Sequence, residues 1–436
     1  MWQTLVNAFK IKEVRRKILI TIGLLFIYRL GCYIPVPGAH FNDGLSSYTY
    51  LSIMSAVSGG ALQYGTFFAM GIGPYINASI IIQLLTVGIP ALERLSKQGE
   101  EGRKRINVYT RILTLFLAIA QAIGILVAFG GSYFKTAEIF GDTGFFNFLS
   151  YAFLVAIYTA GAALTMWIGE RITDYGVSNG ISLLIFAGIL ATAGDAIFAL
   201  ISQLFVASQA QKAAWELIGF VVVAILIFAA IVTVESAERK IPVQYAKQVK
   251  GRKMYGGQST HIPIKVNSSG VMPLIFAFAI LSFPELIMNL FGLNTETSSF
   301  YAWWSNNMGA GSYLYMIILC LLILFFSYFY NQMQFNPDDI SKSIQGNGGF
   351  IPGTRPGKPT ADYLKRVSNR ITLFGAIYLA LVALVPSVLF RAITPDGSLV
   401  NVFSATGLLI VVSVALEFDQ ALTSQIMMKN YKGFLK

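Results

Sequence analysis

The chain has 436 residues, of which 55% are hydrophobic and only 12% are charged, and its mean hydropathy is +0.63. Because a typical soluble domain carries roughly 25% charged residues, this composition excludes an ordinary water-soluble fold. The 32 Lys and Arg residues outnumber the 21 Asp and Glu residues, for a net charge of +11, and in a membrane protein the placement of these basic residues is more informative than their sum.

The first residues predict a short amphipathic helix on the membrane surface. Trp2, Leu5, Val6 and Phe9 recur at helical spacing, and a run of basic residues up to Lys17 follows them. This order differs from that of a cleavable signal peptide. We therefore expect a surface helix that leads directly into the first membrane span.

Ten stretches are long and apolar enough to cross a bilayer, which requires about 20 mostly apolar residues. The predicted spans are 18–36, 67–89, 112–130, 148–168, 181–203, 215–234, 271–291, 313–334, 371–391 and 400–418. Ten spans divide into two halves of five, and because five is odd the second half would run with inverted topology. Inverted repeats are typical of transporters and channels, and ten unrelated spans are the alternative.

Lys and Arg gather in the connections at one end of these spans. They fill the N-terminal segment, 90–111, 169–180, 235–270, 335–370 and the C-terminal tail, and only Arg29, Lys135, Lys212 and Arg391 lie elsewhere. Connections on the cytoplasmic side of a membrane carry such an excess. The pattern predicts a multi-pass protein with both termini in the cytoplasm.

The external segment 38–66 is rich in Gly, Ser and Tyr, and it also carries apolar residues such as Leu51, Ile53 and Leu62. It is too apolar for a plain loop and too broken to span. This composition fits either a re-entrant half-helix buried in protein or an external helix packed on the surface.

The second span opens with Gly71-Ile72-Gly73-Pro74, which predicts a freshly started helix. Ile72 and Ile76 share one helix face, as do Ile181 and Ile185 in the fifth span. Isoleucine pairs in membrane helices usually face lipid or pack between helices, so spacing alone assigns them no further role.

The long cytoplasmic connection 239–267 predicts a β-hairpin. Apolar residues alternate on its two flanks, at Ile241, Val243 and Tyr245 and again at Ile262, Ile264 and Val266. Between the flanks lies a basic tip that contains Arg252 and Lys253. Such a tip could bind ribosomal RNA phosphates or an acidic protein surface, or it could merely enforce orientation.

The second long connection, 335–370, contains a Gly- and Pro-rich stretch from 346 to 359 that we expect to form a stiff, irregular turn displaying Arg355. Its Gly357-Lys358 pair is not a Walker A motif, because Pro359 stands where Ser or Thr is needed. No nucleotide site is predicted. Energy for transport would have to come from a partner or a gradient.

The sequence predicts no cofactor and no metal. Cys32 and Cys320 each lie in an apolar run and are expected to be core thiols rather than a disulfide, and His40 and His261 have no Cys or His neighbours. The predicted spans are nearly bare of ionisable residues, with Asp195 and Glu285 as exceptions. This scarcity argues against a proton- or sodium-coupled carrier.

Several motifs together resemble the SecY family of bacterial protein-translocation channels. They are 67–85 (FFAMGIGPYINASIIIQLL), 99–104 (GEEGRK), 180–182 (GIS), 258–263 (QSTHIP) and 350–357 (FIPGTRPG). The resemblance covers essentially the whole chain, in order, with the same ten spans. It implies an all-α, polytopic membrane protein whose ten transmembrane helices form two inverted five-helix halves around an hourglass pore.

The resemblance also implies an organisation along the chain. Residues 1–180 would hold the amphipathic helix, a plug at about 46–65 and spans one to four. Residues 181–234 would hold spans five and six and the hinge between the halves. Residues 235–270 would form the basic hairpin loop. Residues 271–436 would hold spans seven to ten, the loop 335–370 and the C-terminal tail.

Site residues follow from the same resemblance, position by position. The pore ring would consist of Ile72, Ile76, Ile181, Ile185, Ile275 and Ile410. Asn77 and Phe283 match positions that line a lateral gate between the second and seventh spans. Arg252, Lys253 and Arg355 match positions that dock the SecA ATPase or the ribosome. Lys253 keeps the charge but lacks the planar fork of an arginine.

The function implied is that of the central, non-enzymatic pore subunit of a translocase in the bacterial inner membrane. Its expected partners are SecE, SecG, SecA, the ribosome, preproteins that bear signal peptides, and membrane lipids. The alternative is an inverted-repeat secondary transporter of small solutes, which would need polar residues at mid-membrane. A membrane protease would need a Ser/His dyad, paired aspartates or a zinc motif in the spans, and none is present.

Overall fold

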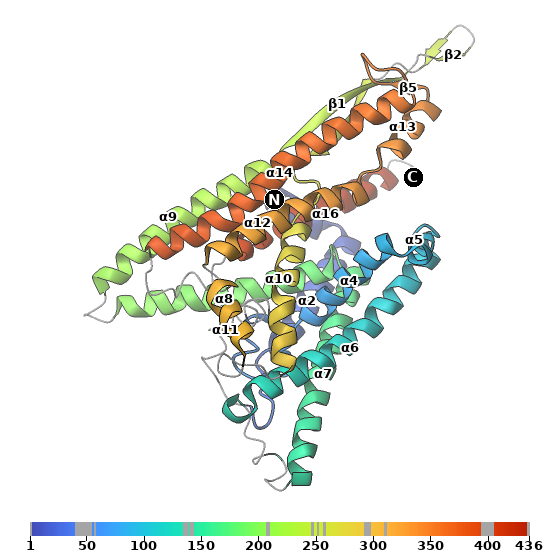
Figure 1. Cartoon of the computed structure of the whole chain (residues 1–436). Coiled ribbons are helices and arrows are strands. Elements are labelled where there is room, and N and C mark those ends of the chain that lie inside the picture. Colours follow the sequence, from blue (N-terminus) through green and yellow to red (C-terminus); the bar gives the residue numbers. More distant parts are fainter. Residues whose placement is uncertain are drawn as a thin grey trace.

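The computed structural model describes residues 2–39, 55, 58–133, 139, 144–205, 210–245, 248–250, 253–255, 259–291, 298–308, 312–393 and 405–433. Its helices are α1 (Trp2–Lys10), α2 (Lys12–Gly31), α4 (Gly73–Gly88), α5 (Pro90–Ser96), α6 (Glu100–Tyr133), α7 (Gly144–Tyr175), α8 (Gly180–Leu204), α9 (Ala210–Glu235), α10 (Met272–Leu290), α11 (Ser299–Met308), α12 (Tyr313–Gln334), α13 (Pro337–Gly346), α14 (Lys358–Ile393) and α16 (Ala405–Gly433) (Figure 1).

A helix occupies each of the ten predicted spans, namely α2, α4, α6, α7, α8, α9, α10, α12, α14 and α16. Within the described residues, six stretches are long and apolar enough to cross a membrane by themselves, and a seventh results if α4 and α5, which meet at a bend of 106°, count as one broken span. The chain is therefore an all-α polytopic membrane protein, and within the described residues its strands lie in the two long connections.

Several helix boundaries differ from those of the predicted spans, and the start of the second span has a local reason. The second span begins at Gly73 rather than at 67, because Gly71 adopts a left-handed conformation (φ +51°) and Pro74 stands at the first turn of α4. The first span ends at Gly31 rather than at 36. The predicted surface helix is present as α1, which packs with α16 in a small core that includes Ala8 and Leu422.

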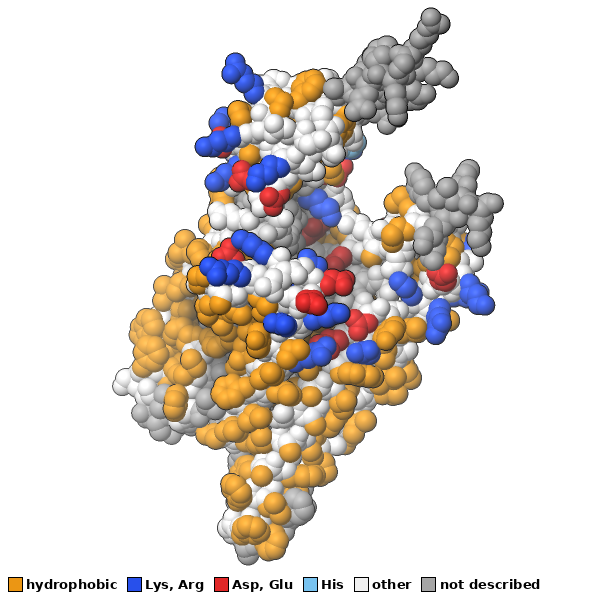
Figure 2. Space-filling view, turned by 90° about the vertical axis from the view of Figure 1, so that its right-hand side faces the viewer, with side chains coloured by type: hydrophobic (Ala, Val, Ile, Leu, Met, Phe, Trp, Pro, Cys, Tyr) orange, Lys and Arg blue, Asp and Glu red, His pale blue; other side chains and the backbone are white. Residues whose placement is uncertain are grey.

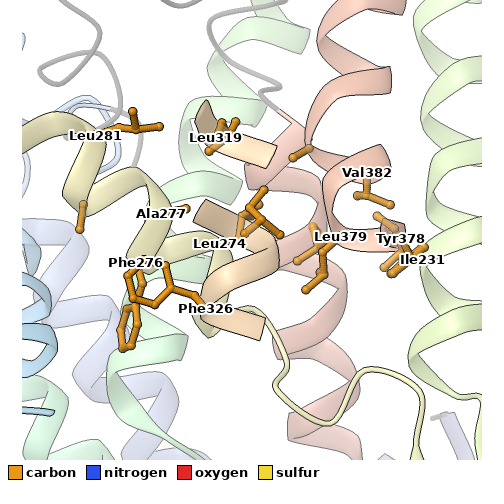
Figure 3. Close-up of a cluster of buried hydrophobic side chains, with 14 of the residues drawn as sticks. Ile231, Leu274, Phe276, Ala277, Leu281, Leu319, Phe326, Tyr378, Leu379 and Val382 are labelled. Atoms are coloured by element: carbon orange, nitrogen blue, oxygen red, sulfur yellow. The ribbon is translucent and has the colours of Figure 1, made fainter. Parts of the chain in front are cut away.

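The three largest apolar cores among the described residues pack the long helices against one another. One lies among α9, α10, α12 and α14 and is drawn in Figure 3, where Phe276 and Phe326 meet beside Leu274 and Leu379. A second lies between α6 and α7 and contains Leu154 and the segment before α4. A third joins α2, α7, α8 and α16 with the start of α4. Cys32 and Cys320 are both free thiols, as predicted.

The surface divides into an apolar body and a charged end. Figure 2 shows hydrophobic side chains over the lower part of the molecule and Lys, Arg, Asp and Glu gathered above it. Only 11% of the most apolar stretch of α9 is buried inside the protein, and Ile225 of this helix is 62% exposed. Such surfaces are stable where lipid covers them.

The predicted hairpin in 239–267 is present. β1 (Glu238–Tyr245) pairs antiparallel with β4 (Ser259–Lys265), with Ile241 opposite Ile262. Ile241 and Val243 are buried and alternate with exposed residues, as the period-2 pattern requires. At the tip, β2 (Gln248–Lys250) pairs with β3 (Lys253–Tyr255), and Figure 1 shows this pair farthest from the helices.

The connection 335–370 contributes a strand that the sequence did not predict. β5 (Gly349–Phe350) pairs with the end of β1 and gives a three-stranded sheet in the order β4-β1-β5. Glycine leaves room for the Tyr245 ring here, because a Cβ on Gly349 would lie 2.9 Å from Tyr245 Cε1. The two long connections therefore form one platform.

Candidate functional site

All six predicted ring residues lie in or against one apolar cluster at the junction of four helices. Ile72 is 1% exposed, Ile185 4% and Ile410 5%. The half-buried side chains that pack against them include Ile76, Ile181 and Ile275. These residues come from the start of α4 and from α8, α10 and α16.

Close helix packing brings two of these side chains together. The backbone of α7 comes near the cluster at Gly169, where a Cβ would lie 3.4 Å from Ile181 Cγ1 and 3.6 Å from Ile72 Cδ1. A Cβ at this position would be in ordinary van der Waals contact with both isoleucines and tight only against Leu184 Cδ1, at 3.2 Å. The backbone of α7 therefore lies within one side-chain layer of Ile72 and Ile181.

The six side chains offer only carbon surface. They can donate or accept no hydrogen bond, so water gains little by entering between them, and a narrow constriction of this kind excludes ions by dewetting. A polypeptide passing such a ring would meet nonpolar contact alone. The contact would be adaptable and would have no preference for sequence or direction.

The segment before α4 packs against the same cluster from the C-terminal end of α2. Ala61 and Phe68 belong to the cluster, Arg29 Nη1 lies 3.5 Å from the carbonyl oxygen of Gly59, and Cys32 Sγ lies 3.6 Å from that of Ser58. Gly59 has φ +70°, and a Cβ there would collide with the Arg29 guanidinium. Of the predicted plug, residues 46–54, 56 and 57 lie outside the described part of the chain.

The two predicted gate residues lie on different helices. Asn77 is 6% exposed on α4, and Phe283 is half-buried on α10, one residue before Pro284. Ile80, three residues after Asn77 on α4, lies in the apolar core with α10 and α12. α4 therefore packs in this core through Ile80 and in the isoleucine cluster through Ile76.

The predicted docking residues are spread over the platform. Arg355 is exposed in the turn between β5 and α14, and its carbonyl oxygen accepts a hydrogen bond from Thr360 Oγ1 at 2.8 Å, which fixes the turn. Lys253 is the first residue of β3, opposite Lys250. Arg252 lies outside the described residues.

A polar network connects the platform to the ring helices, and the sequence did not predict it. Glu235 Oε1 at the end of α9 accepts hydrogen bonds from Asn267 Nδ2 at 2.9 Å and from Ser413 Oγ at 2.7 Å. Lys265 of β4 donates to Gln420 Oε1 of α16 at 2.9 Å. Ser413 follows Ile410 by one helical turn, so the hairpin is tied to a ring helix.

A second part of this network joins the start of α10 to its neighbours. Ser268 Oγ donates to Asn331 Oδ1 of α12 at 3.2 Å, and Asn331 Nδ2 donates to Ser368 Oγ of α14 at 2.9 Å. Polar residues within apolar spans pair across helices in membranes. Asn331, at the polar end of an otherwise apolar run, was the available sequence signal for this network.

No group of three or more His, Cys, Asp or Glu side chains that could hold a metal ion occurs within the described residues. The arrangement therefore consists of an apolar constriction, a segment packed against it, and a basic platform joined to the same helices. These parts suit the passage or gating of a chain and include no constellation for bond-making chemistry among the residues discussed.

Comparisons with known proteins match the whole length of the chain. The family model described as SecY matches residues 66–418. The protein translocase subunit SecY of Streptomyces scabiei is 42% identical over 445 residues, covering 99% of each chain, and that of Mycobacterium bovis is 41% identical over 458 residues, covering all of both chains.

Solved structures show the same fold at lower identity. One described as "The structure of a protein conducting channel" has a TM-score of 0.69 and 21% identity and covers 94% of this chain and 92% of its own. Another, "Sec61 in the Canine ribosome-channel complex from the endoplasmic reticulum", has a TM-score of 0.64 and 18% identity, with the same coverage.

Proposed function

The chain belongs to the SecY family, and from this premise we propose that it is the central pore-forming subunit of a protein translocase. It conducts unfolded secretory proteins across the membrane and releases signal sequences and transmembrane segments sideways into lipid. The observation that carries the proposal is the meeting of six isoleucines from four helices in one apolar cluster. The relatives named above are translocase subunits, and nothing in these comparisons favours a transporter of small solutes.

We assign the pore ring to Ile72, Ile76, Ile181, Ile185, Ile275 and Ile410, in the waist of an hourglass between two inverted halves. The segment 46–65 is the plug beneath this ring. The assignment is supported by Ala61 and Phe68, which lie in the same cluster as the isoleucines. A plug of this composition is apolar enough to pack and, with left-handed glycines at 59 and 60, has the hinges it needs to leave.

The lateral gate opens between α4 and α10, beside Asn77 and Phe283. A signal sequence is an apolar helix, and each central Leu, Ile, Phe or Val gains about 0.3–0.6 kcal/mol on moving into the bilayer. About ten such residues together supply several kcal/mol. This free energy suffices to part helices whose contact is mainly nonpolar.

Direction must come from a partner, because a nonpolar ring has no means of pulling. We assign docking of the SecA ATPase or the ribosome to Arg355, Arg252 and Lys253 on the platform. SecE and SecG complete the complex, with a SecE helix bracing the two halves from outside. In this scheme the chain itself is not an enzyme and has no cofactor.

The chain lies in the bacterial inner membrane with both termini in the cytoplasm. The gathering of basic residues in the hairpin, in the connection 335–370 and in the terminal segments supports this orientation. The platform then faces the cytoplasm, where the motor or the ribosome is found. Preproteins enter from the same side.

Site-specific photocrosslinking tests the proposal. A photoreactive residue at Ile275 is reconstituted with SecE, and a secretory precursor is stalled partway through. The matched control carries the probe at Ile225, which is 62% exposed on the outer face of α9. We expect a crosslink to the precursor from position 275, lost when the signal sequence is deleted, and crosslinks to lipid alone from position 225.

Two results would contradict the proposal in different ways. Export without a crosslink from position 275 would displace the ring while leaving the channel function intact. Absence of both export and crosslink, from a correctly inserted protein with SecE and SecA present, would refute the channel function itself.

A further inference from the structure

One hydrogen bond joins the two sides of the proposed lateral gate. Tyr330 Oη on α12 donates to Gln83 Oε1 on α4 at 2.9 Å. The two residues are 247 positions apart in the sequence, and their helices belong to opposite halves of the proposed channel. Parting α4 from α10 and α12 would break this bond.

The ring that carries this hydroxyl packs against an aromatic side chain of the second half. Tyr330 is 8% exposed, and its ring packs edge-on against Phe276 of α10 with the ring centroids 5.2 Å apart. Phe276 in turn meets Phe326, with the ring centroids 5.6 Å apart. Both residues are labelled in Figure 3. Phe276 directly follows the proposed ring residue Ile275, so a movement of α10 at the ring displaces the tyrosine.

The acceptor is held by the first half. Gln83 Nε2 donates to Ser79 Oγ one turn earlier on α4, at 3.2 Å, which leaves Oε1 toward Tyr330. Ile80, which is 2% exposed, lies on the same helix in the apolar core that contains Phe276 and Leu281. The bond is part-buried, so it is partly shielded from water, and its loss takes one partner from each of its two polar atoms.

From this geometry we propose that Tyr330 and Gln83 are specificity-determining residues that set how strictly the channel selects signal sequences. The inference rests on the proposed function. The side chains of an apolar signal helix that enters between α4 and α10 form no hydrogen bond, so they cannot replace the broken one. Only a signal sequence with enough apolar transfer free energy opens the gate, and a weakened signal does not.

The first test is Tyr330→Phe, which removes the hydroxyl and keeps the ring on Phe276. Export of a precursor with a weakened signal sequence is measured relative to export of the same precursor with its intact signal. We expect this ratio to rise about fivefold, which corresponds to about 1 kcal/mol and to the usual net strength of one hydrogen bond.

The matched control is Tyr328→Phe on the same helix. The Tyr328 hydroxyl donates to the carbonyl oxygen of Asn369 on α14 at 3.4 Å, within the second half. This variant loses the same chemical group without touching α4. We expect its export ratio to equal that of the parental chain.

Gln83→Leu removes the acceptor of the same hydrogen bond on α4 and leaves the tyrosine hydroxyl without it. The export ratio should therefore rise at least as far as in Tyr330→Phe. Adding Tyr330→Phe to Gln83→Leu should raise it no further, because both changes break one interaction. A ratio in Tyr330→Phe equal to that in Tyr328→Phe would overturn the inference. So would fully additive effects of the two changes.

The ratio separates gate selection from simple loss of stability, because a damaged protein exports both precursors less. It also separates this inference from the function on which it rests. If the parental chain exports the intact precursor while the ratios stay equal, only the inference fails. If the parental chain exports no precursor, the proposed function fails and the inference falls with it.

Discussion

Replacing Ile185 with asparagine tests the physical basis of the constriction. Ile185 is 4% exposed on α8 and lies in the cluster with Ile72 and Ile410. Its surroundings there are apolar side chains. An asparagine amide at this place would lose its hydrogen bonds to water and find no replacement among the isoleucines.

The cost of this change falls on the closed ring. An unsatisfied buried polar group costs about 1–3 kcal/mol, whereas in an open, wetted pore the same amide is solvated. At about 1.4 kcal/mol per factor of ten, the ratio of closed to open channels would fall by about fivefold to more than a hundredfold. Loss of nonpolar contact by the smaller side chain acts in the same direction.

Ion conductance of the reconstituted channel in a planar bilayer measures this ratio directly. We expect Ile185→Asn to leak ions without a translocating chain, and Ile185→Leu, which conserves volume and carbon surface, to stay sealed. Equal, low conductance of the Asn and Leu variants, with both proteins inserted in equal amounts, would refute the reasoning that dewetting at this ring closes the pore.

Two further predictions concern the platform. Arg355→Glu should abolish export driven by SecA, because it reverses the charge of an exposed residue in the turn after β5. The control Lys342→Glu, on the exposed side of α13, should leave export near the parental level. Normal export by Arg355→Glu would count against its docking role. Gly349→Val should detach β5 from β1, because a Cβ would lie 2.9 Å from Tyr245 Cε1, and limited proteolysis should then cut 335–370 faster than in Gly346→Val, whose Cβ would meet nothing within 4 Å. Equal cleavage of these two variants would contradict that reasoning.

The hairpin was predictable because its signal is local. Alternation of buried and exposed residues in β1 follows directly from the pleat of a strand, and Ile241 and Val243 are buried as the pattern requires. β5 was not predictable, because two residues carry too little pattern and their partner lies more than a hundred residues earlier. The glycine at 349 was the one signal of the close contact with the Tyr245 side chain.

The ring residues show the limit of spacing as a guide. Ile185 and Ile225 both lie in long apolar helices, yet the first is 4% exposed and the second is 62% exposed. Composition is the same around both, and only the packing of α8 against α16 and the start of α4 separates them. Resemblance to a family supplied the assignment that periodicity could not.

The network around Glu235 gives the platform a mechanical connection to the ring. Its carboxylate binds Asn267, just before α10, and Ser413, one turn from Ile410. Lys265 of the hairpin binds α16 independently. These bonds join the hairpin and the residues before α10 to α16, which supplies Ile410 to the proposed ring.

The sequence by itself determined that this is a membrane protein, where the ten helices lie, that a new helix starts just after Gly71, and that a hairpin follows the sixth span. Each of these features depends on composition, local conformational preference or short-range periodicity. The tertiary structure decided which isoleucines meet, which strand completes the sheet, and that Tyr330 pairs with Gln83 across 247 positions. These contacts depend on how whole helices pack in three dimensions. No short window of sequence records that packing, since lipid-facing and helix-facing positions use the same apolar residues.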